Sequence, residues 1–326
     1  MTRSKRSQIS VDEETYVGKM RIAVVGLGVQ GLKRKLIAGE SCVATVDPLN
    51  PDADYKSLNE LPIDSFDAAF LCVPDSEKAG LIWTLVSEGK HMLVEKPLVI
   101  ASHMDYSRIE EKARTMRSFV YTAYNHRFEP HLVSVRDELN SGKFGRIYRC
   151  SIYYGNGTAA LVRQSPWRDT GPGVISDLGS HVLDLLDFWF SRSLEDINLV
   201  SSSRYENRSP DHAVFSGSEQ SPHVLCEVSM VSWRNYFEAN IFCELGSIHV
   251  RSLCKWGTSE LVIRQRVFPS GIPKETVTSL PQGDPTWRLE FEYFLTAARA
   301  GGETNLAKDS RIHEAIARLA RQAEVQ

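Results

Sequence analysis

A glycine-rich turn between an apolar run and a helical stretch is the feature that most constrains how this chain can fold. Residues 26–31 read Gly-Leu-Gly-Val-Gln-Gly and match the pattern G-x-G-x-x-G. The β-branched run at residues 21–25 precedes the turn, and Asp47 ends the next apolar run, residues 42–46. The pattern alone arises by chance in glycine-containing turns. With a strand before it, a helix after it and an acid ending the next strand, it indicates a βαβ unit that binds a dinucleotide.

Each position of the turn has a physical role in such a site. Gly26 permits the tight turn, and Gly28 lets the backbone approach a pyrophosphate. Gly31 allows the helix to pack closely on the strand. Val29 and Gln30 open the helix, whose N–H groups and dipole hold phosphate charge. All five residues are therefore predicted to bind the cofactor.

Asp47 bears on which dinucleotide is bound. It lies 21 residues after Gly26, where a carboxylate can accept hydrogen bonds from the adenosine ribose hydroxyls. Pro48, Leu49 and Asn50 follow it, without an arginine to receive a 2′-phosphate. The sequence therefore favours NAD over NADP.

Two kinds of pattern divide the chain. Before residue 142, further apolar runs at residues 68–73, 91–94 and 119–123 alternate with helical stretches, which predicts a doubly wound parallel sheet. After residue 145, many runs alternate apolar and polar residues, which predicts a largely antiparallel sheet with one face open or joined to another subunit. Seven such runs are predicted strands, at residues 146–154, 197–205, 223–233, 235–243, 247–251, 260–268 and 275–280.

The predicted organisation is thus α/β with two domains. An N-terminal arm spans residues 1–19, a dinucleotide-binding domain residues 20–142, and a substrate-binding and oligomerisation domain residues 143–326. Helices are expected at residues 180–189, 286–300 and 309–324.

Composition excludes several classes of protein. The net charge is −3, so the basic surface of a nucleic-acid binder is not expected, and Lys33-Arg34-Lys35 is interpreted as a solvated helix face. The six cysteines are scattered without a C-x-x-C pair, which fits reduced thiols in a cytoplasmic protein. Neither a secretory signal nor an apolar run of membrane-spanning length is present.

Residues able to perform chemistry occur at two places. Lys96, in Glu95-Lys96-Pro97, leaves the fourth predicted strand at its carboxyl end, where it could stabilise an alkoxide or simply pair with Glu95. Asp177 and His181 are four residues apart, so on one helix they share a face, and the histidine could accept a hydroxyl proton. Asp184 continues that face as an orienting or packing residue. Metal binding by these three lacks a fourth ligand, and no metal is predicted.

Taken in order, these motifs resemble the glucose–fructose oxidoreductase, inositol dehydrogenase and MocA (Gfo/Idh/MocA) family of NAD(P)-dependent oxidoreductases. The similarity runs in motif order from about residue 20 to residue 181. It includes the glycine turn, Glu95-Lys96-Pro97, Asn125-His126-Arg127-Phe128 and the run at residues 171–184. Lys78 departs from it, at a position where members commonly carry histidine.

The resemblance implies a Rossmann domain followed by a domain with a large open antiparallel sheet, which usually forms a dimer or tetramer interface. His181 would be the acid/base, Asp177 its hydrogen-bonded partner, and Lys96 the residue that positions the reacting oxygen. The predicted cofactor site also includes Lys96, together with Val73, Pro74, Glu95 and Asn125. The predicted substrate site comprises Lys96, Asn125, Arg127, Trp167, Arg168, Asp177 and His181.

The expected function is NAD-dependent hydride transfer to or from a sugar, cyclitol or nucleotide-activated sugar. Two alternatives remain open at this point. One is a glycosidase that oxidises and re-reduces its substrate around a retained NAD, and the other is a non-catalytic, cofactor-sensing regulator. The presence of Lys96, Asp177 and His181 disfavours the regulator.

Overall fold

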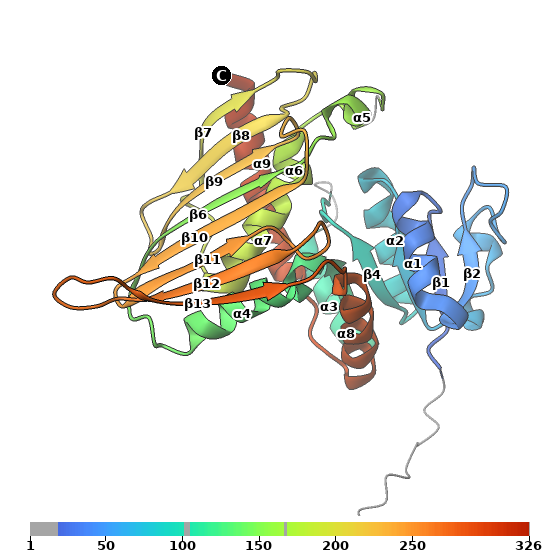
Figure 1. Ribbon diagram of the computed structural model, residues 1–326. Coiled ribbons are helices and arrows are strands. Elements are labelled where there is room, and N and C mark those ends of the chain that lie inside the picture. The colour runs from blue at the N-terminus through green and yellow to red at the C-terminus, as the bar shows by residue number, and fades with distance from the viewer. Residues whose placement is uncertain (1–18, 101–104, 166–167, 326) are drawn as a thin grey trace, which may run out of the picture.

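The computed structural model describes residues 19–100, 105–165 and 168–325 and confirms the predicted α/β fold. A parallel five-stranded sheet and a larger eight-stranded sheet lie side by side (Figure 1). Of the helices in these ranges, none is both long and apolar enough to cross a membrane.

The smaller sheet consists of parallel strands in the order β2-β1-β3-β4-β5. Their bounds are β1 Ile22–Val25, β2 Cys42–Val46, β3 Ala68–Leu71, β4 His91–Glu95 and β5 Val120–Ala123. Strands β1, β3 and β5 are buried along their whole length, as expected for a sheet covered on both faces. Because the strands are parallel, β2, β3, β4 and β5 all end at the edge of the sheet where the glycine turn follows β1.

The helices of this part are α1 Val29–Ala38, α2 Asp75–Ser87 and α3 Tyr106–Met116, with short 3₁₀ turns η1 Gly39–Ser41, η2 Leu58–Glu60 and η3 Ile63–Ser65. Helix α1 stops at Gly39, whose φ of 54° lies in the left-handed region that favours glycine. This explains the short helix between the glycine turn and β2.

One prediction for α1 is wrong. Its buried face includes Arg34, which is 1% exposed, so the basic run is not a fully solvated face. Arg34 pairs with Glu95 and with Glu290, each at 2.7 Å. Two carboxylates distant in sequence compensate the charge, which the local pattern of basic residues does not reveal.

The larger sheet has the order β13-β12-β11-β10-β6-β9-β8-β7 and is antiparallel except for the parallel pair β6 and β9. Its strands are β6 Ile147–Gly155, β7 Asn198–Ser203, β8 His212–Gly217, β9 His223–Ser229, β10 Tyr236–Cys243, β11 Gly246–Arg251, β12 Ser259–Gln265 and β13 Lys274–Leu280. The sequence pattern did not predict β8, a short strand between polar and glycine-containing segments. Along β8 and β10, every second residue is buried.

The remaining elements are η4 Asn125–Phe128, α4 Pro130–Asn140, α5 Ala159–Arg163, α6 Val174–Asp177, α7 Gly179–Phe190, α8 Thr286–Ala300 and α9 Leu306–Val325. Helices α7 and α9 lie behind the large sheet in Figure 1. Their apolar residues share its core, for example Val182 and Leu186 of α7 with Ile316 of α9.

Helix α8 returns the chain to the smaller sheet. Its Phe294 is fully buried in the core formed with β1, β3 and β5, and packs edge-on against Phe70 at 5.3 Å between ring centroids. The start of α9 also contributes Leu306 to a core of the smaller sheet. The C-terminal segment therefore ties the two sheets together and holds the edge where the candidate site lies.

Candidate functional site

The glycine turn has the close contacts that its sequence predicts. Gly26 has a φ of 89°, and a Cβ there would lie 2.4 Å from the carbonyl oxygen of Cys72. A Cβ on Gly31 would lie 1.7 Å from the carbonyl oxygen of Gly26, so helix and strand approach too closely for any side chain. At Gly28, by contrast, no atom lies within 4 Å of an added Cβ. The turn is therefore closely packed at Gly26 and Gly31 and open at Gly28.

Asp47 holds the turn to the end of β2. Its Oδ2 accepts a hydrogen bond from the Leu27 N–H at 2.7 Å, and its Oδ1 accepts those of Leu49 and Asn50, both at 2.8 Å. Partial burial by itself would raise the pKa of Asp47, but these N–H donors outweigh it and lower that pKa. A carboxylate has about four acceptor positions, so one remains for a ribose hydroxyl.

These features fit a dinucleotide. The first N–H groups of α1, which begins at Val29 and continues with Gln30, have no acceptor within the helix and can bind phosphate. Val29 is 85% exposed beside the open space at Gly28. Val73 and Pro74 follow β3 at the same edge, and Pro74 precedes the first residue of α2.

Lys96 lies in the turn after β4, and a neighbouring lysine supports that turn. The buried Lys78 donates hydrogen bonds to the carbonyl oxygens of Glu95 and Pro97, at 2.6 and 2.7 Å, and pairs with Asp75. The residue that departs from the family pattern thus fixes the backbone on both sides of Lys96. Glu95 is further held through its pair with Arg34.

The Lys96 side chain reaches across to α6. Its Nζ donates to the carbonyl oxygen of Asp177 at 2.7 Å and to Oδ1 of the same residue at 2.9 Å. Arg168 lies 3.6 Å from the other carboxylate oxygen. Burial would raise the pKa of Asp177, but the charges of Lys96 and Arg168 and the hydrogen bond from Lys96 lower it, so Asp177 is ionised at neutral pH.

The predicted pairing of Asp177 with His181 is not what the structure shows. The carboxylate of Asp177 faces Lys96 and Arg168, and within the described ranges Nδ1 of His181 is enclosed without a hydrogen-bond partner. The reason is a tertiary contact, because Lys96 binds both the carbonyl oxygen and the carboxylate of Asp177, the last residue of α6.

His181 instead belongs to an aromatic cluster. Its ring stacks on His126 at 4.1 Å between centroids, with 21° between the planes, and meets Tyr154 edge-on at 6.1 Å. Burial, the neighbouring His126 and the charges of Lys96 and Lys255 lower the pKa of His181 well below 6.5. His181 is therefore neutral at physiological pH and can accept a proton.

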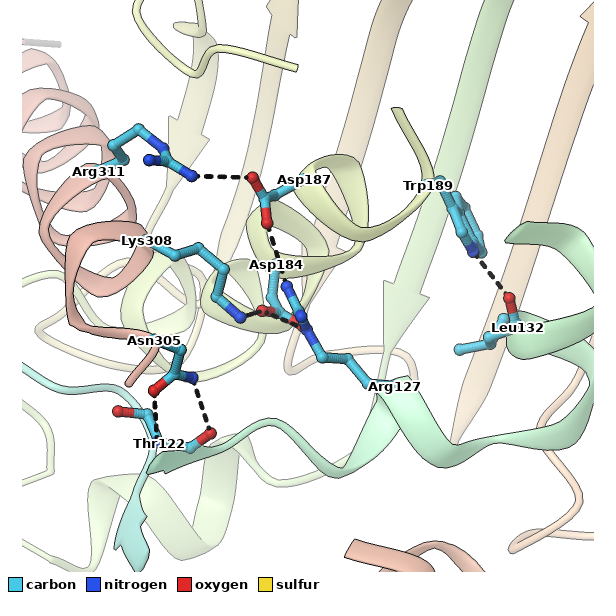
Figure 2. Close-up of polar contacts among 9 residues, drawn as sticks. All are labelled: Thr122, Arg127, Leu132, Asp184, Asp187, Trp189, Asn305, Lys308 and Arg311. Carbon is cyan, nitrogen blue, oxygen red and sulfur yellow. Dashed lines mark hydrogen bonds and ion pairs between the residues drawn. The ribbon is translucent and has the colours of Figure 1, made fainter. Parts of the chain in front are cut away.

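The helix that carries His181 is anchored on its other side by ion pairs (Figure 2). Asp184 and Asp187 of α7 both bind Arg127 of η4, at 3.0 and 3.1 Å. From α9, Lys308 reaches Asp184 at 2.5 Å and Arg311 reaches Asp187 at 3.1 Å. These pairs fix α7 against the turn that carries His126.

The same pairs give Arg127, which was predicted near the substrate, a structural part. Two carboxylates one helical turn apart bind its guanidinium and tie η4 to α7. Asn125, predicted near the nicotinamide or substrate, donates to the Thr286 hydroxyl at 2.9 Å and is buried. Trp167 lies outside the described residues.

Three contributors escaped the sequence analysis: His126, Lys255 and Lys78 in its supporting role. His126 lies inside the quoted motif Asn125-His126-Arg127-Phe128, so the motif itself could have drawn attention to it. Lys255 follows β11 in a segment without any motif, and only the folded chain brings it 2.9 Å from His126.

Comparison with known proteins places these features in a wider context. The family model for the GFO/IDH/MocA C-terminal domain matches residues 132–249. The rhizopine catabolism protein MocA of Rhizobium meliloti is 20% identical over 225 residues, an alignment covering 65% of this chain and 68% of that protein. Alignments with five other curated relatives span 40–57% of their lengths, and three of those relatives are named inositol dehydrogenases.

Solved structures share the whole fold. A protein described as an NADPH-dependent oxidoreductase, from Desulfitobacterium hafniense, superposes with a TM-score of 0.82 at 16% identity, over 94% of this chain and 96% of that one. Levoglucosan dehydrogenase in complex with NADH superposes with a TM-score of 0.78 at 17% identity, over 94% and 97%. At these identities the likeness establishes the fold alone.

Proposed function

We propose that this chain, which belongs to the Gfo/Idh/MocA family, is a nicotinamide-dependent oxidoreductase acting on a hydroxyl group of a sugar or cyclitol. The supporting relatives are dehydrogenases of inositol and of levoglucosan. The chain spans about half the length of most of the curated relatives that it matches.

The observation that carries the proposal is the contact of Lys96 with Asp177, 2.9 Å across the two parts of the fold. It places an ammonium group at the edge of the sheet where the glycine turn would hold a dinucleotide. The same ammonium is close enough to His181 to lower the pKa of that histidine. These contacts support a site in which a binding turn, a positioning cation and a neutral base act together.

Each residue then has a defined task. When bound, the nicotinamide supplies the chemistry of hydride acceptance or return. Lys96 donates two hydrogen bonds to Asp177, and a lysine has three donors, so the third can bind the substrate oxygen and stabilise it as an alkoxide. Since Nδ1 of His181 is enclosed, we assign Nε2 as the atom that takes the hydroxyl proton. Asp177 positions Lys96.

The choice between the two nicotinamide cofactors is part of the proposal. We favour NAD, because Asp47 would repel a 2′-phosphate and keeps one acceptor position for a ribose hydroxyl. The solved relatives include a complex with NADH and a protein described as NADPH-dependent, so both cofactors belong in the assay.

The first test measures absorbance of the reduced nicotinamide with NAD or NADP and a panel of hexoses, levoglucosan, inositol and nucleotide sugars. We expect Lys96→Met and His181→Ala to lower kcat/KM by about 100-fold or more. Lys274→Met and His223→Ala, at exposed positions of the large sheet, are the matched controls and should keep wild-type rates. Equal turnover by all four variants would exclude the proposed catalytic group.

The second test measures cofactor binding directly by calorimetry. Gly28→Val adds a side chain where the free protein has open space, so its melting temperature should stay unchanged while cofactor binding is lost. Wild-type affinity in this variant would show that the glycine turn does not hold the dinucleotide.

We also propose the remaining organisation predicted from the sequence. Cofactor binding belongs to residues 20–142, while residues 143–326 bind substrate and join copies into a dimer or tetramer in the cytoplasm. Leu225, half-exposed on β9, faces away from the buried Val224 and Cys226, so it lies on the face available to a second copy. The six cysteines are free thiols, which suits a reducing compartment. Light scattering on the wild type and Leu225→Glu tests the association.

A further inference from the structure

A lysine without a role in the scheme above lies beside the histidine stack. Lys255 follows β11, and its Nζ is 2.9 Å from Nε2 of His126, whose ring stacks on His181. The same ammonium lies 4.6 Å from the centroid of the Trp256 ring. Trp256 in turn packs against Tyr154 at 5.8 Å, and Tyr154 meets His181. Lys255 is therefore one ring away from the proposed base.

The charge of Lys255 is poorly compensated. Among the residues that the structure describes, no carboxylate lies within ion-pair distance of its ammonium, although Asp284 and Glu129 act on it from further away. Asp284 already pairs with Lys33 and accepts the Thr286 hydroxyl, at 3.5 and 2.6 Å. Glu129 accepts the backbone N–H of Cys254 at 3.1 Å. Burial lowers the pKa of Lys255 to about 8, the direction expected for a cation short of partners.

The other described side chains around the histidine stack do not supply a negative charge for Lys255. Lys96 and Arg168 share the single carboxylate of Asp177, and both His126 and His181 are held neutral. One of the three donors of Lys255 faces His126, which leaves two for another acceptor. A neutral polyol would leave this ammonium without a counter-charge, whereas an anion would supply one in a partly buried site.

We propose that Lys255 binds a carboxylate carried by the substrate, so that the enzyme selects acidic sugars or acidic cyclitols over their neutral counterparts. This inference rests on the proposed oxidoreductase function. Two free donors on one ammonium match the two oxygens of a carboxylate. A phosphate is usually held by several cations or by an arginine fork, and Arg168 is already committed to Asp177.

The test compares substrates that differ only in the acid group. Glucose, glucuronate and glucose 6-phosphate are assayed with the wild type, Lys255→Met, Lys255→Arg and the exposed-lysine control Lys274→Met. The wild type should prefer glucuronate, and Lys255→Met should lower kcat/KM for it by about 10-fold to 100-fold, the range for a charged hydrogen bond. Glucose should change by less than about 3-fold, Lys255→Arg should retain part of the preference, and Lys274→Met should keep all of it.

Calorimetry covers the case in which none of these sugars is turned over. Glucuronate, gluconate and glucose are titrated into the cofactor-saturated wild type and the same variants. Binding of an acid that weakens in Lys255→Met and persists in Lys274→Met supports the proposal. A wild type that binds acids and neutral sugars alike, prefers glucose 6-phosphate, or binds none of the acids overturns it.

Cofactor affinity, measured first on the same samples, separates this inference from the proposed function. A wild type that does not bind NAD or NADP refutes both proposals. A wild type that binds cofactor and oxidises neutral sugars, with equal losses for acid and neutral substrates in Lys255→Met, refutes only the carboxylate site. In that case Lys255 would act on His126 and His181 instead.

Discussion

Replacing Arg34 by methionine removes a cation that pairs with both the partly buried Glu95 and the fully buried Glu290. The guanidinium is 1% exposed, lies 2.7 Å from both Glu95 and Glu290, and stacks over Trp287 at 4.2 Å. Glu290 is fully buried, and burial already raises its pKa to about 7 against the opposing charge of Arg34. Without the arginine, that carboxyl must either take up a proton or remain charged in the core.

The magnitude follows from this arrangement. Removing one partner of a buried ion pair costs about 3–5 kcal/mol. With an unfolding entropy of about 2.1 cal/mol/K per residue over 326 residues, the loss lowers the melting temperature by about 4–7 °C. The loss of stability caused by Arg34→Met should be larger at pH 8 than at pH 5. When the pKa of a carboxyl is higher in the folded than in the unfolded protein, the folded protein loses stability as the pH rises toward the folded pKa.

Thermal unfolding at both pH values, monitored by circular dichroism, is the assay. Lys35→Met, at the exposed position next to Arg34, is the matched control and should shift the melting temperature by less than about 1 °C. Adding Glu290→Gln to Arg34→Met should recover part of the loss at pH 8. A shift no larger than that of Lys35→Met, or one independent of pH, would refute the role assigned to Arg34.

Three further predictions concern other positions. Gly31→Ala should lower both the melting temperature and cofactor affinity, because its Cβ would lie 1.7 Å from a backbone oxygen; unchanged calorimetric titrations and melts would contradict the close packing of the turn. The pKa of Asp309 is raised to about 7 by burial, so this carboxyl should account for a loss on the order of 1–3 kcal/mol in wild-type stability between pH 5 and pH 8, and Asp309→Asn should lose correspondingly less than the wild type. If urea denaturation shows the same change in unfolding free energy between pH 5 and pH 8 for the two proteins, the effect is ruled out. The lowered pKa of His181 keeps the base neutral in mild acid, so kcat/KM for oxidation should start to fall only below pH 6.5; a midpoint above that value would contradict its environment.

Much of the fold follows from local sequence patterns. The strands of the smaller sheet are uninterrupted apolar runs that end in turn residues, and such runs are buried on both faces wherever they are placed. The glycine turn is equally local, because the φ of Gly26 and the space at Gly31 are set by residues within one βα unit and its neighbouring strand. Strand β8 was missed because six residues between polar segments carry too little periodic signal.

Local sequence patterns predicted only part of the candidate site. Lys96 and Asp177 could be singled out, since each stands in a motif at the end of an element. Their partners could not be assigned, because spacing within a chain does not say which charges meet in space. Asp177 therefore pairs with Lys96 instead of His181, and Arg127 pairs with Asp184, a partner that the sequence did not indicate.

What the sequence by itself determined is thus the α/β fold, the glycine turn and the motif residues at one edge of the parallel sheet. Only the tertiary structure decided that Arg34 is buried, that α8 returns to the smaller sheet, and that Lys255 meets His126. The last contact joins residues 129 positions apart. Such contacts depend on the packing of whole sheets and helices, since the burial of a charge is tolerated only where a distant segment brings a partner to it.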